Sequence, residues 1–151
     1  MIKIDVFIKN KKWKKYISNP DKYLKNKIKY IKPSIKFIKN KNINFSVLLA
    51  GNKEIKNLNH RFRNKNKITD ILSFPYNEKN EIKKIRNKKI IYLGDIILNF
   101  YKINKKDFKR EFDKLWVHGL LHLLGYKHYR NKDFYKMNKL ENRILKQIHK
   151  G

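Results

Sequence analysis

Three of the five histidines in this chain of 151 residues fall in one short segment, HGLLHLLGYKH, at positions 118, 122 and 128. His118 and His122 are four residues apart, so a helix would carry both imidazoles on one face, where they could bind the same cation. Gly125 is suited to end that helix, because glycine readily takes the left-handed conformation of a helix C-terminus. The chain could then bring His128 back to the same point. The spacing predicts a metal site, and three imidazoles on zinc leave one coordination position for a reactant.

The metzincin peptidase pattern, H-E-x-x-H-x-x-G-x-x-H, has the same spacing of histidines and glycine, but position 119 here is glycine. Without the glutamate of that pattern, no carboxylate is placed to take a proton from water, which disfavours peptide hydrolysis by that route. A metal can still lower the pKa of a water and polarise a phosphoryl oxygen, so phosphodiester cleavage stays open. The alternative interpretation is that these histidines only pack or form hydrogen bonds on an apolar helix face.

Hydrophobic periodicity predicts the elements that must hold these side chains. Strands are predicted at residues 2–6, 44–50, 69–74 and 89–100, with a break or bulge at Gly94 and Asp95 in the last one. Helices are predicted at residues 21–40, where Pro33 should kink or split the helix, and at 53–63, 104–124 and 131–148. Of these, 104–124 is predicted to be the longest, and the polar segment 76–89 is predicted to be a loop or a loose hairpin.

The order of these elements predicts an α+β fold. Residues 1–151 are expected to form a single domain, because the chain has no internal repeat and no linker rich in serine or glycine. A small mixed sheet would be covered by helices, and the three-histidine site would lie at the end of the long helix. His60 and His149 are left outside this site, and we expect both at the surface.

Charge and composition restrict the partners. The formal net charge is +28, from 40 Lys and Arg against 12 Asp and Glu, which favours a polyanion such as nucleic acid and, second to it, an anionic membrane surface. Lysine, asparagine and isoleucine also have AT-rich codons, so part of this charge can be compositional. The chain has no cysteine, and no apolar run approaches the roughly 18 residues of a membrane span. We therefore expect a soluble cytoplasmic protein that does not enter membranes.

Three segments together resemble one known family. HGLLHLLGYKH is similar to the H-G-x-L-H-L-x-G-Y-D-H signature of the YbeY family, bacterial endoribonucleases of ribosomal RNA maturation. LNHRFRNKNKITDILSFP at 58–75 and YLGDIIL at 92–98 resemble two further family segments, in the family's order. The resemblance implies a single-strand-specific endoribonuclease that acts at the 3′ end of 16S ribosomal RNA and in ribosome quality control. It also implies one Zn²⁺ held by His118, His122 and His128, and as partners ribosomal RNA, a small-subunit ribosomal protein and an assembly GTPase.

The resemblance also assigns a role to Arg63, which falls on a functionally important arginine of the family. A guanidinium can hold a phosphate through two parallel hydrogen bonds and stabilise negative charge in the transition state. Without the resemblance, Arg63 would be read as a solvated residue of a basic loop. Asp70, Ser73 and Asp95 lie in the matching segments too, and each could either orient a ligand imidazole or form ordinary turn and hairpin hydrogen bonds.

The chain departs from the family pattern at three positions. Lys127 replaces the aspartate usual beside the third histidine, and a cation there would oppose a dication unless it points away. Ile68 replaces a proline and Phe62 a tyrosine, with small expected effects. Two other functions stay open: a metal-dependent hydrolase of another substrate such as peptide, and a non-catalytic, zinc-containing ribosome assembly factor.

Overall fold

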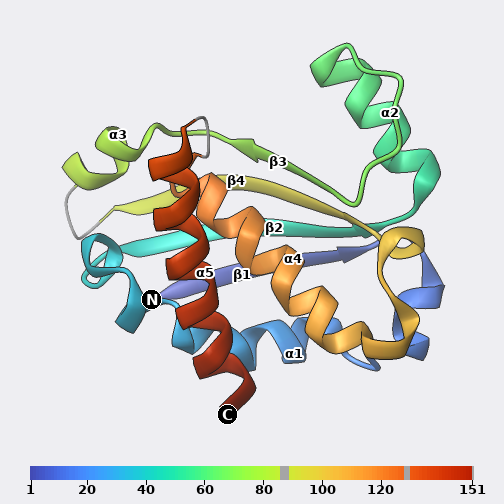
Figure 1. The fold of residues 1–151 in the computed structure, drawn as a ribbon, viewed down its shortest axis with the longest axis horizontal. Helices are drawn as coiled ribbons and strands as arrows, with labels where there is room; N and C mark the ends of the chain where they lie inside the picture. Colours follow the sequence, from blue (N-terminus) through green and yellow to red (C-terminus); the bar gives the residue numbers. More distant parts are fainter. Residues whose placement is uncertain (86–88, 128–129, 151) are drawn as a thin grey trace.

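A computed structural model describes residues 1–85, 89–127 and 130–150. Four strands form one sheet in the order β1-β2-β4-β3 (Figure 1). Strands β1 (Ile2–Ile8), β2 (Asn42–Ala50) and β4 (Ile90–Asn99) are parallel, and β3 (Ile71–Pro75) runs antiparallel to β4 as an edge strand. The predicted α+β fold with a small mixed sheet is therefore confirmed.

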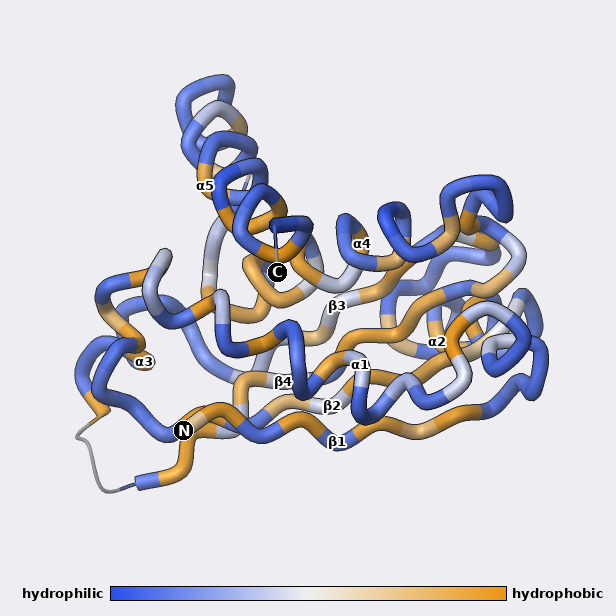
Figure 2. Tube along the Cα trace, turned by 90° about the horizontal axis from the view of Figure 1, so that it is seen from below, coloured by the Kyte–Doolittle hydropathy of each residue, from blue (hydrophilic) through white to orange (hydrophobic). Residues whose placement is uncertain are grey.

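The described residues form five α-helices around the sheet: α1 (Pro20–Lys27), α2 (Asn52–Arg63), α3 (Lys79–Lys84), α4 (Phe108–Leu123) and α5 (Asn131–Lys150). Helix α4 packs on β3, β4 and α5, and Figure 2 shows α4 and α5 together on one side of the sheet. Helix α2 packs on the opposite face, against a smaller apolar cluster. No helix in the described part of the chain is long and apolar enough to cross a membrane.

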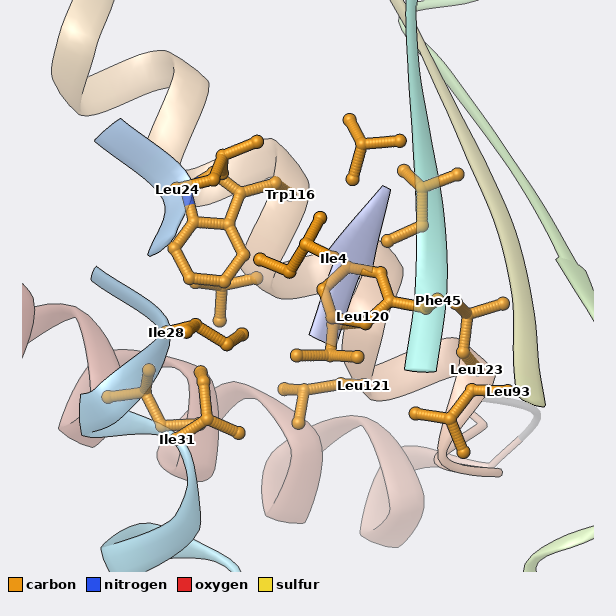
Figure 3. Packing of buried hydrophobic residues seen from close by; sticks show 14 of the residues in the cluster. Ile4, Leu24, Ile28, Ile31, Phe45, Leu93, Trp116, Leu120, Leu121 and Leu123 are labelled. Atoms are coloured by element: carbon orange, nitrogen blue, oxygen red, sulfur yellow. The ribbon is translucent and has the colours of Figure 1, made fainter. Parts of the chain in front are cut away.

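The alternation of side chains along β2 sorts residues between the two faces. Ile43, Phe45, Val47 and Leu49 are fully buried in the main core, whereas the side chains between them point to the other face. In the main core the strands meet α1, α4 and the 3-10 turns after α1, as Figure 3 shows for Phe45, Trp116 and Leu120. Full burial of such a side chain contributes about 1.5–3 kcal/mol, so this core holds α4 firmly on the sheet.

A bulge in β4 was predicted at Gly94 and is confirmed. The register pairs Asn44 with Tyr92 and Ser46 with Asp95, so β4 has one residue more than β2 in this interval. Gly94 has φ +138, and an added Cβ would lie 2.1 Å from the backbone oxygen of Phe74. Only glycine fits there. The extra residue also brings the side chains of Tyr92 and Asp95 to the same face, although three positions separate them.

Three predictions about helices were wrong. Segment 76–89 contains helix α3, because Glu78 and Glu81 form a capping box and Ile82 is fully buried. The helix predicted at 21–40 is α-helical only to Lys27 and continues as short 3-10 turns, Ile28–Tyr30, Lys32–Ser34 and Lys36–Ile38. The segment is split as Pro33 predicted, but the α-helix already ends before that proline, which lies in the first turn of a 3-10 segment. The segment 104–124 was predicted to form the longest helix, but its helix α4 has 16 residues, whereas α5 has 20.

His149 is exposed, as expected, but it also has a partner in the fold. Its Nε2 atom lies 3.5 Å from Oδ2 of Asp113, a carboxylate buried in α4. Tyr23 and Trp116 both donate hydrogen bonds to the same carboxylate. Burial raises the pKa of Asp113, and its hydrogen-bond donors oppose that shift. A buried carboxylate needs such donors, so the end of α5 is held to α1 and α4 through Asp113. His60 is exposed as expected too.

Candidate metal centre

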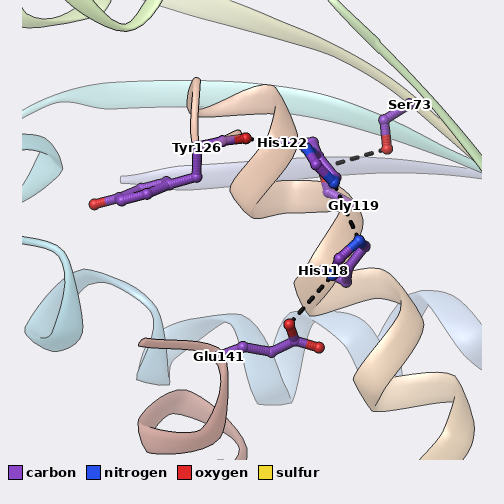
Figure 4. Close-up of polar contacts among 6 residues, drawn as sticks. All are labelled: Ser73, His118, Gly119, His122, Tyr126 and Glu141. Carbon is purple, nitrogen blue, oxygen red and sulfur yellow. Dashed lines mark hydrogen bonds and ion pairs between the residues drawn. The ribbon is translucent and has the colours of Figure 1, made fainter. Parts of the chain in front are cut away.

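Helix α4 carries His118 and His122 on one face, as the four-residue spacing requires. Their Nε2 atoms lie 3.0 Å apart and point toward the same place (Figure 4). Both side chains line a cleft and are only partly buried. Two ring nitrogens in this arrangement can bind one cation between them.

The other ring nitrogen of each histidine has an acceptor, and these acceptors determine the tautomers. Nδ1 of His122 lies 3.0 Å from the carbonyl oxygen of Tyr126, and a carbonyl can only accept, so this Nδ1 carries the proton. Nδ1 of His118 lies 3.2 Å from Oε2 of Glu141, a buried residue of α5, and donates to that carboxylate. With the proton on Nδ1, the Nε2 atom of each neutral imidazole carries the lone pair, so both Nε2 atoms can bind a cation in the cleft. Hydrogen bonds of this kind behind ligand imidazoles orient the rings and make them more basic, so this donor set fits a zinc ion.

The third predicted ligand, His128, lies outside the described residues, so its role stays a prediction. Within the described ranges there is no group of three side chains that could hold a metal. The turn that leads toward position 128 has the predicted form: Gly125 has φ +93 and donates its N–H to the carbonyl of His122 at 3.0 Å. The helix therefore ends at Gly125, as the glycine predicted.

The histidines share their cleft with Arg63. The cleft has a volume of about 320 Å³ and lies between the end of α2, strand β3, helix α4 and the turn after it. It is lined by Arg63, Ile71, Ser73, Pro75, His118, His122, Tyr126 and Lys127. The structure thus brings together residues that are 55 positions apart in the sequence, from Arg63 to His118.

Arg63 is the last residue of α2, and the helix stops because Asn64 takes the left-handed conformation with φ 57. The guanidinium lies along the outer edge of β3. Its Nη2 donates to the carbonyl oxygen of Ser73 at 3.2 Å, and its Cζ lies 5.6 Å from the centre of the Phe74 ring. That bond uses one N–H of several, so the exposed guanidinium can also take up an anion that enters the cleft.

Gly119 faces the sheet and not the cleft. A Cβ at this position would lie 2.8 Å from Cδ1 of Ile71 and 3.0 Å from Cγ2 of Ile96, so α4 and the sheet are in direct contact there. A side chain at this position would require the ends of the Ile71 and Ile96 side chains to shift. The close packing of α4 on the sheet is thus consistent with a glycine where the peptidase pattern has a glutamate.

Lys127 lines the cleft, and its Nζ lies 3.7 Å from Oε2 of Glu78, just before α3. Both side chains are largely exposed, so this ion pair contributes little to stability. Its consequence is local: the carboxylate offsets part of the positive charge that the lysine brings to the cleft.

The residues that orient the imidazoles differ from those considered in the sequence. Asp70 is exposed, and Asp95 lies on the other face of the sheet, where Tyr92 donates to it. Ser73 lines the cleft, with Oγ 3.5 Å from the carbonyl of Gly119. Glu141, which sequence reasoning missed, does contact an imidazole. A signal for it exists, since Glu141 shares the apolar face of α5 with Leu140 and Ile144, and a carboxylate on such a face needs a partner.

Comparisons with known proteins agree on one family. The family model described as Endoribonuclease YbeY matches residues 7–149. Endoribonuclease YbeY of Pelagibacter ubique is 44% identical over 154 residues, covering 98% of this chain and 97% of its own length. The protein of that name from Borreliella burgdorferi is 43% identical over 112 residues, covering 68% of this chain and 72% of its own. A Thermotoga maritima protein solved in solution shares the fold, with TM-score 0.60 and 24% identity over 96% of this chain and 88% of its own.

Proposed function

The chain belongs to the YbeY family, and from this premise we propose that it is a metal-dependent endoribonuclease specific for single-stranded RNA. Its substrate is the 3′ end of 16S ribosomal RNA, with a further part in ribosome quality control in the cytoplasm. One observation supports the proposal most strongly. The Nε2 atoms of His118 and His122 lie 3.0 Å apart in a cleft that Arg63 also lines. That is a site for a cation and a phosphate together.

The metal would be one zinc ion held by His118, His122 and His128, of which the first two have the required donor geometry. When bound, zinc would lower the pKa of a water molecule and polarise a phosphoryl oxygen. Glu141 and the Tyr126 carbonyl hold the two imidazoles in the tautomer that leaves Nε2 available, so the site needs no rearrangement of α4 to receive the ion.

Arg63 binds the phosphate and stabilises the charge that develops on it during cleavage. Its exposed guanidinium, fixed at one N–H by the Ser73 carbonyl, can form charge-assisted hydrogen bonds with phosphate oxygens. Either water or the 2′-hydroxyl of the RNA is the attacking group. The products distinguish the two routes, because only attack by the 2′-hydroxyl leaves a 2′,3′-cyclic phosphate.

The surface charge supports an RNA substrate, and we propose a small-subunit ribosomal protein and an assembly GTPase as further partners. A peptidase is the less favoured alternative, since position 119 is glycine and carries no carboxylate to take a proton from water. A non-catalytic assembly factor that uses zinc only for its structure is the other alternative, and the partly exposed histidines favour a reactive site over it.

The test is direct. The purified protein, loaded with zinc or treated with chelator, is incubated with single-stranded RNA, with a duplex of the same sequence and with denatured casein. We expect cleavage of the single strand alone, and only with metal. Cleavage of casein without cleavage of RNA would replace the proposal by the peptidase. An Arg63→Ala protein that fully restores 16S maturation would replace it by the assembly factor.

A further inference from the structure

A second hollow lies on the face of the sheet opposite α4. Its volume is about 480 Å³, within the range of small-ligand sites, and its walls come from all four strands and from α2. The lining residues are Phe7, Ser46, Leu48, Leu58, Phe62, Phe74, Tyr76, Asp95 and Ile97. None of these residues lines the cleft of the metal centre.

Aromatic side chains dominate its walls and stay open to solvent. Phe62 is 61% exposed and Tyr76 is 65% exposed, although both are large side chains. The Phe62 and Phe74 rings meet edge to face, with centroids 5.6 Å apart. Rings held in this way by neighbouring elements offer flat faces on which a base can stack, which is how proteins bind single-stranded nucleic acids without reading their sequence.

A carboxylate completes the hollow. Tyr92 donates a hydrogen bond to Asp95, and the hydroxyls of Tyr92 and Ser46 are 2.8 Å apart. Burial is the main cause that raises the pKa of Tyr92 to about 12, and the hydrogen bond to Asp95 is the second. The phenol therefore keeps its proton at neutral pH and holds the carboxylate in place. A carboxylate only accepts hydrogen bonds and would repel a phosphate. It therefore suits the N–H groups on the edge of a base.

Edge strand β3 separates this hollow from the metal cleft. Ile71, Ser73 and Pro75 face the cleft, whereas Phe74 and Tyr76 face the hollow. Arg63 joins the two sides, since it lines the cleft while its Cζ lies 5.6 Å from the Phe74 ring. Beside it, the Arg61 guanidinium lies 5.6 Å from the Phe62 ring. A polyanionic strand that reaches Arg63 can therefore pass over the edge of β3 and meet these rings.

We propose that the hollow binds a nucleobase of the RNA strand whose phosphate contacts Arg63, with the base stacked on Phe62 and its N–H groups donating to Asp95. This proposal rests on the proposed ribonuclease function. Guanine is the preferred base, because its Watson–Crick edge places two donors side by side, and a carboxylate accepts two parallel N–H bonds. Uracil is the poorest, since its one N–H stands between two carbonyls that the carboxylate repels.

Fluorescence anisotropy on the metal-free, full-length protein tests this without cleavage. The probes are two labelled, unstructured RNAs, one of uridines only and one with a single guanosine among uridines. We expect Phe62→Ala to weaken binding of both by roughly 5- to 150-fold, the loss of one stacked base. Asp95→Asn should remove the preference for the guanosine RNA without weakening binding of the all-uridine RNA, because it also removes a charge that repels uracil and phosphate. Tyr135→Ala, which removes an equally exposed aromatic ring from α5, should change neither.

Circular dichroism and thermal melts show that each variant is folded before its affinity is compared. Wild-type affinity and guanosine preference in both hollow variants would overturn the proposal. An RNA cleavage assay with the zinc-loaded wild-type protein distinguishes failure of the base site from failure of the proposed ribonuclease function. If this protein cleaves RNA while the hollow variants bind normally, only the base site is wrong. If it neither binds nor cleaves RNA, the ribonuclease function is wrong as well.

Discussion

The imidazole of His118 depends on a carboxylate that lies 23 residues further along the chain. Glu141 is buried on α5, and its Oε2 lies 3.2 Å from Nδ1 of His118. Since a buried carboxylate is costly unless it accepts hydrogen bonds, this contact stabilises α5 and fixes the ring at the same time. The same side chain therefore serves both packing and the metal site.

Replacing Glu141 by alanine should lower zinc affinity by about 10- to 100-fold, because the ring loses the acceptor that orients it. Competition with a chromophoric chelator measures this. Asp133→Ala is the matched control, since it removes a partly exposed carboxylate of the same helix that pairs with Arg130 and does not contact His118. Equal zinc affinity in the wild type and the Glu141 variant would contradict the role of this residue.

The assignment of the third ligand is tested by metal content. His122→Ala and His128→Ala should each reduce bound zinc well below one ion per chain, because two imidazoles rarely retain zinc in the presence of competing ligands. Elemental analysis after dialysis measures the stoichiometry. His60→Ala, an exposed histidine of α2, should keep the full content. Should the His128 variant retain zinc like the control, another group must complete the site.

The bulge in β4 decides which side chains share a face of the sheet. Without the extra residue, Tyr92 and Asp95 would point to opposite faces, since side chains alternate along a strand. With it, the phenol and the carboxylate meet, and close packing of β3 on β4 requires glycine at position 94.

Gly94→Ala should lower the free energy of unfolding by more than about 2 kcal/mol, because it adds both a strained backbone conformation and a contact with the Phe74 carbonyl. Urea denaturation measures the change. Gly51→Ala is the control: its φ is −137, and the closest atom to an added Cβ belongs to the exposed ring of Tyr101. A loss at position 94 no larger than at position 51 would show that β3 can move away from β4.

The charge of the whole molecule bears on how it binds RNA and carries no information about the reaction. With 40 basic and 12 acidic side chains, much of the binding free energy for RNA should come from release of counterions. The affinity for single-stranded RNA should therefore fall steeply with salt, with a log–log slope of about 0.7 for each phosphate contacted. A titration by anisotropy measures it, and an affinity independent of salt would mean that the lysines do not contact the RNA.

Much of the architecture follows from local patterns. Alternation at residues 2–6 and apolar segments at 44–50, 69–74 and 89–100 predicted the four strands. The helical spacing of apolar residues predicted α2, α4 and α5 to within a few residues. Helix α3 was missed because one buried residue, Ile82, and a capping box stabilise it in a segment that is otherwise polar. The 3-10 turns after α1 were missed because the isoleucines there are buried with a spacing that also fits a helix.

The sequence by itself determined the pair His118 and His122 and the end of their helix at Gly125, since the i to i+4 spacing and the conformational freedom of glycine are local properties. Only the tertiary structure decided that Glu141 orients His118, that Arg63 opens into the same cleft, and that Gly119 faces the sheet. These depend on how α2, α4 and α5 pack around β3 and β4. Packing is set by burial summed over the whole core, which no short segment of sequence contains.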